Sequence, residues 1–296
     1  IVSREDVPSG TPVLPSVGAM RRKRRIATQE IYKWKARLNV HGGKQEYGLN
    51  YWETYSPVVT WTTVRLILVL VLLNKWVSRQ VDFVLAYPQA DIEVPLYMEI
   101  PRGFLSEGSR KKNCLLLEKN VYGQRQAGHV WNQYLHEGLL ARGFRQSQVD
   151  MCLNYRGNVA LLFFVDDGIF VAPTQKDIDK AYELLTKPVL SSKGEVLHRA
   201  FIMTDEGDLS DYLGVKIDTL KNGTIKVTQP HLIQSVLNDL KFNERTGTKK
   251  TPAVPTVKLH RDVNGAPFAE DWNYRSVIGK LNFIEKSTRP EIAYQA

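Results

Sequence analysis

Two adjacent aspartates, Asp166 and Asp167, interrupt an otherwise apolar stretch between residues 158 and 172. An apolar segment, a doubly charged turn and a second apolar segment predict a β-hairpin with both carboxylates at its tip. Carboxylates that lie side by side repel each other, and a divalent cation is the usual way to relieve that repulsion. The pair therefore indicates a metal-binding site.

A third aspartate, Asp82, lies far upstream in another strand-like stretch, residues 79–87. Three carboxylates at the ends of neighbouring strands would form a two-metal site, an arrangement that serves phosphoryl transfer. A single aspartate is more typical of a turn or a helix cap, so this interpretation depends on the three side chains meeting in space. We therefore expect Asp82, Asp166 and Asp167 to share one site.

An aromatic side chain and an amide accompany these carboxylates. Tyr87 follows Asp82 by five residues, and at this offset its ring could lie under the sugar of an incoming nucleotide and clash with a 2′-hydroxyl. Core packing of Tyr87 is the alternative. Gln126 precedes an expected helix and could contact the nucleotide, whereas Arg125 and His129 beside it are equally compatible with surface positions.

The composition indicates a folded globular protein with a nucleic-acid partner. The 296 residues are 43% hydrophobic and 24% charged, which is typical of a chain that buries a core and holds more than one subdomain. The formal net charge of +9 favours a polyanionic partner, and nucleic acid is the commonest one. A basic enzyme without such a partner is the alternative.

Cysteine usage and hydropathy bear on the cellular context. Cys114 and Cys152 form neither a disulfide framework nor a metal-binding spacing, which favours a reducing compartment. The longest apolar run, residues 66–73, is too short to span a bilayer, so we expect no membrane association. The chain starts with Ile1 and ends inside a patterned stretch, which leads us to expect a segment of a longer polypeptide.

Hydrophobic patterning predicts an α+β fold. Residues 1–29, with five consecutive basic residues at 21–25, are expected to form a basic flexible lead, with nucleic-acid contact or nuclear import as the alternative. Strand and helix patterns intermix over residues 30–228, and residues 229–296 are mainly helical. We expect a body that presents the carboxylates on a sheet, with a small helical appendage that grips a long substrate.

Strict alternation over residues 34–40 predicts a half-buried strand with its four apolar residues inward and Lys35 and Arg37 on the solvent face. The other expected elements are helices at 60–75, 130–142 and 174–187, a hairpin around Asn222-Gly223, and helices at 231–241 and 272–286 that flank a linker at 246–258.

Eight sequence blocks follow one another along the chain. They cover residues 33–38, 55–59, 82–87, 96–104, 121–127, 164–167, 212–215 and 287–294. Through these blocks the chain, from about Val7 to Ala296, resembles the reverse transcriptase of copia-type long-terminal-repeat retrotransposons, the RNA-dependent DNA polymerase segment of the pol polyprotein. Any single block is a weak signal, whereas the ordered set is highly specific.

This resemblance implies a right-hand polymerase fold with fingers, a palm built on an antiparallel sheet and a small helical thumb. Residues 30–228 would form interleaved fingers and palm, and residues 229–296 a truncated thumb or connection. The implied activity is template-directed DNA synthesis from deoxynucleoside triphosphates by two-metal phosphoryl transfer. The two ions would be Mg²⁺, with Mn²⁺ as the alternative.

The resemblance also implies roles for particular residues, although it leaves open which of Lys35 and Arg37 meets the triphosphate. The implied roles are catalysis and metal binding for Asp82, Asp166 and Asp167, nucleotide binding for Lys35, Arg37, Tyr87 and Gln126, and primer-end support for Tyr212, Leu213 and Gly214.

The implied partners are an RNA or DNA template with its primer, deoxynucleoside triphosphates, and the ribonuclease H and integrase segments of the same polyprotein. No membrane partner is implied. The implied location is the cytoplasm, inside a virus-like particle, with entry into the nucleus as a further expectation.

Four departures from the family pattern bear on activity. Phe164 replaces the usual tyrosine, Gly128 and His129 replace proline and arginine, and Gly18 stands where tryptophan is common. Residues 188–200 are longer than the corresponding connection. A missing large side chain would cost about 3–5 kcal/mol if its site is buried. The alternative function is therefore a catalytically decayed nucleic-acid-binding remnant of a retrotransposon polymerase, and a metal-dependent nuclease ranks third.

Overall fold

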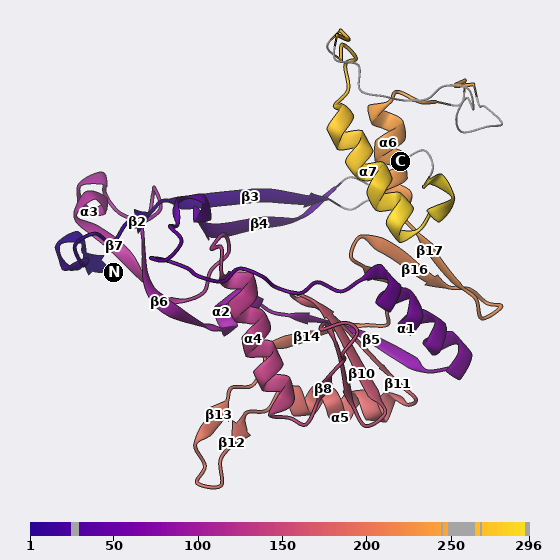
Figure 1. Ribbon diagram of the computed structural model, residues 1–296, viewed down its shortest axis with the longest axis horizontal. Helices are drawn as coiled ribbons and strands as arrows, with labels where there is room; N and C mark the ends of the chain where they lie inside the picture. The colour runs from indigo at the N-terminus through magenta and orange to yellow at the C-terminus, as the bar shows by residue number, and fades with distance from the viewer. Residues whose placement is uncertain (25–29, 244, 248–263, 267, 294–296) are drawn as a thin grey trace.

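The computed structural model describes residues 1–24, 30–243, 245–247, 264–266 and 268–293 (Figure 1). A six-stranded sheet with helices packed against it forms the middle of the molecule. A second sheet and a long two-stranded arm lie towards the N-terminal end, and a pair of helices lies at the C-terminal end. The fold is thus a mixture of helices and several sheets.

The central sheet has the strand order β14-β5-β11-β10-β9-β8, and every neighbouring pair is antiparallel. Its strands are β5 (Val77–Phe83), β8 (Arg145–Gln146), β9 (Leu153–Arg156), β10 (Val159–Phe164), β11 (Asp167–Ala172) and β14 (Met203–Gly207). β10 and β11 are apolar at successive positions because these central strands are buried on both faces. The predicted hairpin is confirmed, with the two aspartates at its tip.

Three helices contribute apolar side chains to the main core: α1 (Trp61–Asn74), α4 (Ala127–Leu140) and α5 (Gln175–Leu185). Thr60 and Thr174 cap α1 and α5 by accepting hydrogen bonds from backbone amides three residues later. All three helices were predicted. α4 begins three residues earlier than expected, because the apolar periodicity that reveals the helix starts only at Val130.

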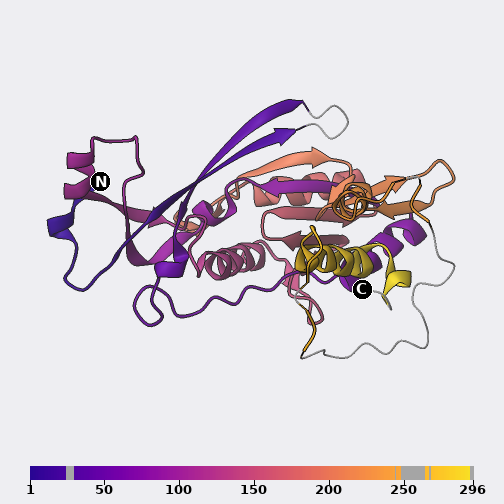
Figure 2. The same cartoon turned by 90° about the horizontal axis from the view of Figure 1, so that it is seen from above.

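The N-terminal unit has its own sheet and a small core. Strands β1 (Val2–Ser3), β7 (Asn113–Lys119), β6 (Asp91–Met98) and β2 (Val13–Leu14) form the sheet in that order, and β3 (Ser16–Arg24) pairs with β4 (Ile31–Val40) to form the arm. Leu14, Val40, Leu96 and Met98 pack together in this unit. The arm extends from this sheet in both views (Figure 1, Figure 2).

The expectation of a flexible lead over residues 1–29 is wrong for residues 1–24, because strands from this range pair with β4, β6 and β7. Residues 25–29 lie outside the described residues. Two of these strands contain only two residues, and two of the partner strands lie far away in the sequence. The local sequence pattern therefore did not predict β1 and β2.

Along most of β4 the facing is the reverse of the prediction, although Val40 at the end of the strand is buried as predicted. Trp34 is 72% exposed and Leu38 is 41% exposed, whereas Lys35 and Arg37 are partly buried. The side of the arm that faces the body carries the cations towards two aspartates in the cavity described below. Attraction between opposite charges, rather than burial of apolar surface, accounts for this facing.

The C-terminal unit follows a small three-stranded sheet. Its elements are β15 (Asp211–Tyr212), β16 (Val215–Thr219), β17 (Ile225–Thr228), α6 (Pro230–Asp239), α7 (Tyr274–Ser287) and the 3-10 helix η3 (Pro290–Ile292). α6 and α7 pack around Val236, Val277 and Ile284. The predicted hairpin and both predicted helices are confirmed, and the linker at 246–258 lies outside the described residues apart from 246 and 247.

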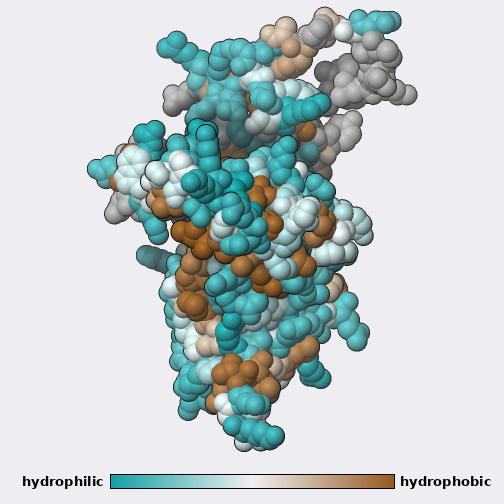
Figure 3. All heavy atoms as spheres, turned by 90° about the vertical axis from the view of Figure 1, so that its left-hand side faces the viewer, coloured by the Kyte–Doolittle hydropathy of each residue, from teal (hydrophilic) through white to brown (hydrophobic). Residues whose placement is uncertain are grey.

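Short elements complete the fold. They are α2 (Ala86–Gln89), α3 (Glu107–Lys112), the 3-10 helices η1 (Arg4–Asp6) and η2 (Gly42–Lys44), and the hairpin of β12 (Val189–Leu190) and β13 (Val196–His198). The surface at the N-terminal end carries apolar patches among hydrophilic side chains (Figure 3). Within the described ranges, none of the helices has both the length and the apolar character needed to cross a bilayer.

Candidate active site

The structure brings the three predicted carboxylates together. β5 and β11 are adjacent antiparallel strands, and their register places Asp82 directly opposite Asp167. Residues that lie directly opposite in such a pair project from the same face, with Cβ atoms about 4.5–5.5 Å apart. Asp166 precedes Asp167 in the turn between β10 and β11. Aspartates from distant parts of the sequence therefore meet at one end of the central sheet.

The turn that carries Asp166 is fixed by two hydrogen bonds. Phe164 pairs with Asp167, so Val165 and Asp166 form a two-residue turn. The φ angle of Val165 is 56°, a conformation that costs energy for a β-branched residue. The indole Nε1 of Trp131 donates to the Val165 carbonyl oxygen at 2.7 Å, and the Phe83 amide donates to the Asp166 carbonyl oxygen at 2.7 Å. Neighbouring elements thus hold a strained turn in place.

The pKa of Asp167 is raised by burial and by the neighbouring carboxylates. Burial, followed by the nearby charges of Asp166, Asp82 and Glu206, raises the pKa of Asp167 to about 6. Glu206 comes from β14, the edge strand that pairs with β5. The excess negative charge means that a cation bound here would find a favourable potential.

Asp82 and Asp166 line a cavity of about 430 Å³ opposite the cations of the arm. The lining includes Lys35 and Arg37 of β4. An adjoining cavity of about 320 Å³ shares both cations and adds Arg21. The arm and the central sheet therefore enclose a space with carboxylates on one side and cations on the other. Such a space suits a ligand that carries phosphates and metal ions.

The donor set is compatible with Mg²⁺ but incomplete by itself. In the part of the chain that the structure describes, no three histidine, cysteine or acidic side chains are arranged to hold an ion alone. Mg²⁺ in proteins usually takes one or two carboxylates and completes its shell with water and substrate phosphates. Asp82 and Asp166 in one cavity match that requirement, with Asp167 beside them.

Two tyrosines lie beside the carboxylates. The rings of Tyr87 and Tyr122 have centroids 5.0 Å apart, and the Arg37 guanidinium lies 5.0 Å from the Tyr122 centroid. Burial, and then the charge of Asp166, raises the pKa of Tyr87. Burial also raises the pKa of Tyr122, with a further contribution from Asp166. Tyr87 is half-buried against the main core, whereas Tyr122 lines both cavities.

Tyr122 is the residue that sequence reasoning missed. It belongs to the block at 121–127, in which Gln126 is the residue predicted to contact the nucleotide. The signal available in the sequence was an aromatic residue directly before a glycine. In the structure this glycine, Gly123, has a φ angle of 91°. The backbone there approaches β4 closely, because the Val40 amide donates to the Tyr122 carbonyl oxygen at 2.9 Å.

Gln126 is buried and is not among the residues that line the cavity. Its Oε1 accepts a hydrogen bond from Gln45 Nε2 at 2.9 Å, and the Gln45 Oε1 accepts one from the Arg125 amide at 2.8 Å. The Gln126 Nε2 has no hydrogen-bond partner among the described residues. A contact between Gln126 and a nucleotide stays a prediction.

Tyr212, Leu213 and Gly214 form a turn whose only exposed part is its tip. Tyr212 pairs with Val215, and both Leu213 (φ 51°) and Gly214 (φ 76°) have positive φ, as in a two-residue type I′ hairpin turn. The Tyr212 side chain is only 1% exposed, and burial raises its pKa. A contact to a primer would therefore come from the tip of the turn and not from the Tyr212 ring.

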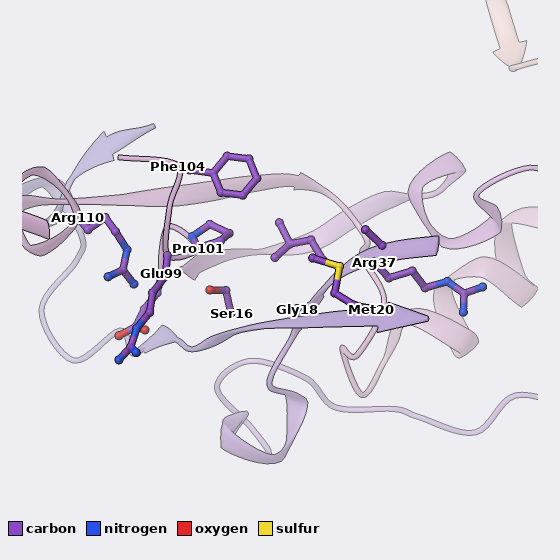
Figure 4. A pocket seen from close by; sticks show the side chains of 11 residues that line it. Ser16, Gly18, Met20, Arg37, Glu99, Pro101, Phe104 and Arg110 are labelled. Carbon is purple, nitrogen blue, oxygen red and sulfur yellow. The ribbon is translucent and has the colours of Figure 1, made fainter. Parts of the chain in front are cut away.

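A third cavity, of about 540 Å³, lies on the arm beyond these groups (Figure 4). Met20, Pro101 and Phe104 surround it, whereas the Arg37 side chain extends away from Pro101 and Phe104. Gly18 also lines this cavity and is exposed, and no described atom lies within 4 Å of the position where a Cβ on Gly18 would sit.

Comparison with known proteins shows the family to which the chain belongs. The profile of the family described as reverse transcriptase (RNA-dependent DNA polymerase) matches residues 6–256. The chain is 29% identical over 277 residues to the retrovirus-related Pol polyprotein from transposon TNT 1-94 of Nicotiana tabacum, which covers 90% of this chain and 20% of that relative. It is also 29% identical over 270 residues to the Pol polyprotein from transposon RE1 of Arabidopsis thaliana, covering 89% and 17%.

A putative transposon Ty5-1 protein of Saccharomyces cerevisiae is 26% identical over 220 residues, which covers 71% of this chain and 64% of that protein. The chain thus spans about a fifth of the length of the plant relatives that it matches. The profile covers well over half of the chain, and the relatives are transposon Pol polyproteins. The chain therefore belongs to the reverse transcriptase (RNA-dependent DNA polymerase) family, as a segment of the kind found in copia-type retrotransposons.

Proposed function

We propose that this chain is an active RNA-directed DNA polymerase that extends a primer on an RNA or DNA template with deoxynucleoside triphosphates. The observation that carries the proposal is the register of β5 and β11, which sets Asp82 opposite Asp167 and beside Asp166. The cations of β4 face these acids across one cavity. A triphosphate with its metal ions has the charge pattern that such a cavity accommodates.

In this proposal the central sheet is the palm, the N-terminal sheet and the arm are the fingers, and α6 with α7 is the thumb. Residues 30–228 and 229–296 keep the boundaries expected from the sequence, and residues 1–24 join the fingers because their strands pair there. The palm presents the carboxylates on rigid strands. The thumb would hold the duplex of template and primer.

Lys35 and Arg37 would bind the triphosphate, and Asp82, Asp166 and Asp167 would hold two Mg²⁺ ions, with Mn²⁺ as the alternative. When bound, such ions activate the attacking 3′-hydroxyl and neutralise charge on the departing pyrophosphate. Each carboxylate contributes negative charge at a fixed place on the sheet. The arm contributes positive charge that the pyrophosphate needs as it leaves.

The remaining assignments are those that the family resemblance implies. Tyr87 selects against the ribose 2′-hydroxyl, Gln126 contacts the nucleotide, and the turn at Leu213 and Gly214 supports the primer end. In the longer polyprotein the partners are ribonuclease H and integrase segments. The proposed location is a cytoplasmic virus-like particle, with entry into the nucleus.

Two of the four departures that favour the alternative, a decayed remnant that only binds nucleic acid, lie outside the elements that position the aspartates. Gly18 is exposed, so the missing side chain leaves no buried gap. Residues 189–198 form a hairpin of β12 and β13 with one irregularity in its register, and this two-stranded sheet is separate from the central sheet (Figure 1). Neither departure disturbs the elements that position the aspartates.

Primer extension tests the proposal. The purified chain is incubated with a DNA primer on an RNA template, Mg²⁺ and deoxynucleoside triphosphates, beside Asp166→Asn. We expect extension by the unmodified chain and none by the variant. Binding of the primer–template without extension would instead support the remnant. Degradation of labelled nucleic acid in the absence of nucleotides would support a nuclease.

A further inference from the structure

Tyr122 lies where the arm meets the central sheet, and no motif assigns it a role. It is one of the residues that line both the cavity with Asp82 and Asp166 and the adjoining cavity with Arg21. Its ring contacts two groups with proposed roles in substrate binding. The Arg37 guanidinium lies 5.0 Å from its centroid, and the Tyr87 ring centroid also lies 5.0 Å away.

The backbone at Tyr122 is joined to the strand that carries Arg37. The Val40 amide at the end of β4 donates to the Tyr122 carbonyl oxygen at 2.9 Å. The next residue, Gly123, packs so closely that a Cβ on it would lie 2.2 Å from the Val40 carbonyl oxygen. Tyr122 therefore has a fixed position relative to β4, and its ring is a rigid support for groups on that strand.

The Arg37 guanidinium is available to a ligand and needs such a support. Among the described residues it forms no ion pair, and its side chain extends away from Pro101 and Phe104 (Figure 4). A guanidinium binds phosphate best when its plane is held in one orientation, because its donors form a rigid fork. An aromatic face beneath it restricts that orientation and adds a cation–π attraction.

We propose that Tyr122 is a positioning residue for the nucleoside triphosphate, which holds Arg37 towards the phosphates and supports Tyr87 towards the sugar. One side chain would thereby couple binding of the triphosphate to selection of deoxyribose over ribose. This inference rests on the proposed polymerase function and goes beyond it, because it names the residue that joins phosphate binding to sugar selection.

Steady-state kinetics of single-nucleotide incorporation test the inference with Tyr122→Leu and Tyr122→Phe. Because leucine removes the aromatic face, Tyr122→Leu raises the KM for the deoxynucleotide by about 3- to 10-fold. The preference for deoxynucleotides over ribonucleotides falls by a similar factor, and kcat changes by less than about twofold. Tyr122→Phe keeps the ring and stays within about twofold of the unmodified chain in both measures. Partial misfolding lowers the apparent kcat and leaves KM unchanged, so KM distinguishes positioning from loss of folded protein.

A double-mutant cycle with Arg37→Ala shows whether Tyr122 acts through Arg37. If it does, adding Tyr122→Leu to Arg37→Ala raises the KM no further. The matched control is Tyr51→Leu, which removes a ring that the Arg125 guanidinium contacts at 5.3 Å outside the cavity lining.

Additive effects of Tyr122→Leu and Arg37→Ala on KM would overturn the inference. It would also be overturned if Tyr122→Leu affected KM and sugar preference no more than Tyr51→Leu does. In either case extension by the unmodified chain would leave the polymerase function standing. Failure of the unmodified chain to extend any primer would overturn that function, and the inference with it.

Discussion

At the candidate site, burial and the charges of neighbouring acids both act on Asp167. Its partial burial disfavours the ionised carboxylate, and Asp166 and Asp82 add to the effect, so its pKa rises to about 6. The folded state therefore holds a proton on Asp167 at a pH where the unfolded chain has released it. By linkage, stability falls as the pH rises from about 4 to about 6, and the loss is complete above that range.

Replacing Asp167 with asparagine removes this penalty. We expect Asp167→Asn to be more stable than the unmodified chain at pH 7.5 by about 1–2 kcal/mol, once solvent screening is allowed for. At pH 3 the two proteins differ little, because Asp167 is largely protonated in both the folded and the unfolded chain. Urea unfolding without divalent ions at the two pH values measures the difference. Equal stability at pH 7.5 would contradict the raised pKa.

Tyr87 offers a test of sugar selection at the same scale. Tyr87→Val shortens the side chain, and we expect ribonucleotide incorporation relative to deoxynucleotide to rise by about 10- to 100-fold. Tyr87→Phe keeps the ring and the selectivity. Competition assays with matched nucleotide pairs give the ratio. An unchanged ratio in Tyr87→Val would show that Tyr87 only packs against the core.

Residue types predicted part of this site. Asp82, Asp166 and Asp167 were found because carboxylates next to apolar strand patterns are unusual, and the structure brings them together. Tyr122 was missed because a single tyrosine in a loop has many roles, and its contacts come from elements distant in the sequence. The position of Gln126 behind its hydrogen bond to Gln45 was likewise not visible in the sequence.

At the scale of elements, α4 supports the hairpin that carries the aspartates. Trp131 on α4 donates its indole N–H to the Val165 carbonyl in the strained turn. We expect Trp131→Phe to leave that carbonyl without its partner and to destabilise the chain by about 1–3 kcal/mol. Because the turn also positions Asp166, kcat for primer extension falls by about tenfold or more.

The matched control for this variant is Trp34→Phe, since Trp34 is 72% exposed. Thermal unfolding and single-turnover extension are measured for both variants. Loss of stability in Trp131→Phe without any loss in the single-turnover rate of the folded protein would show that the indole bond does not position Asp166.

Element patterns were most informative where one face meets the core and least informative on the arm. The periodicity of α1 and the capping residue of α5 predicted both helices, because local propensity and burial agree there. On β4 the alternation was correct in period but wrong in facing, since Trp34 is exposed and Arg37 faces the cavity. Alternation in a sequence shows that the two faces of a strand differ, but it does not show which face turns inward. On β4 the position of the aspartates decided this, because they attract the cations of the strand.

At the scale of the whole molecule, Arg65 connects the C-terminal helices to the body. This α1 side chain donates to the carbonyl oxygens of Lys286 and Ser287 at the end of α7, the latter at 3.1 Å. Cationic donors at a helix C-terminus satisfy carbonyls that have no partner within the helix. The contact joins two cores that are otherwise separate clusters.

We expect Arg65→Ala to loosen α7 without affecting the central sheet. Amides of residues 274–287 should exchange with solvent about 3- to 10-fold faster, and amides of α4 should keep their rates. Arg65→Lys retains a cationic donor and should show a smaller effect. Hydrogen–deuterium exchange measures both segments. Equal exchange of α7 in Arg65→Ala and the unmodified chain would show that the contact contributes nothing to docking of the C-terminal unit.

Asp82 is the acid that only the fold brings to the other two, so its replacement tests the shared carboxylate site most directly. Mg²⁺-dependent incorporation of one deoxynucleotide is measured for the unmodified chain, for Asp82→Asn, and for Asp205→Asn as a control on the neighbouring strand β14. We predict a loss of at least about 100-fold in rate for Asp82→Asn and a change of less than about threefold for Asp205→Asn. Incorporation by Asp82→Asn at the rate of the unmodified chain would contradict the shared carboxylate site.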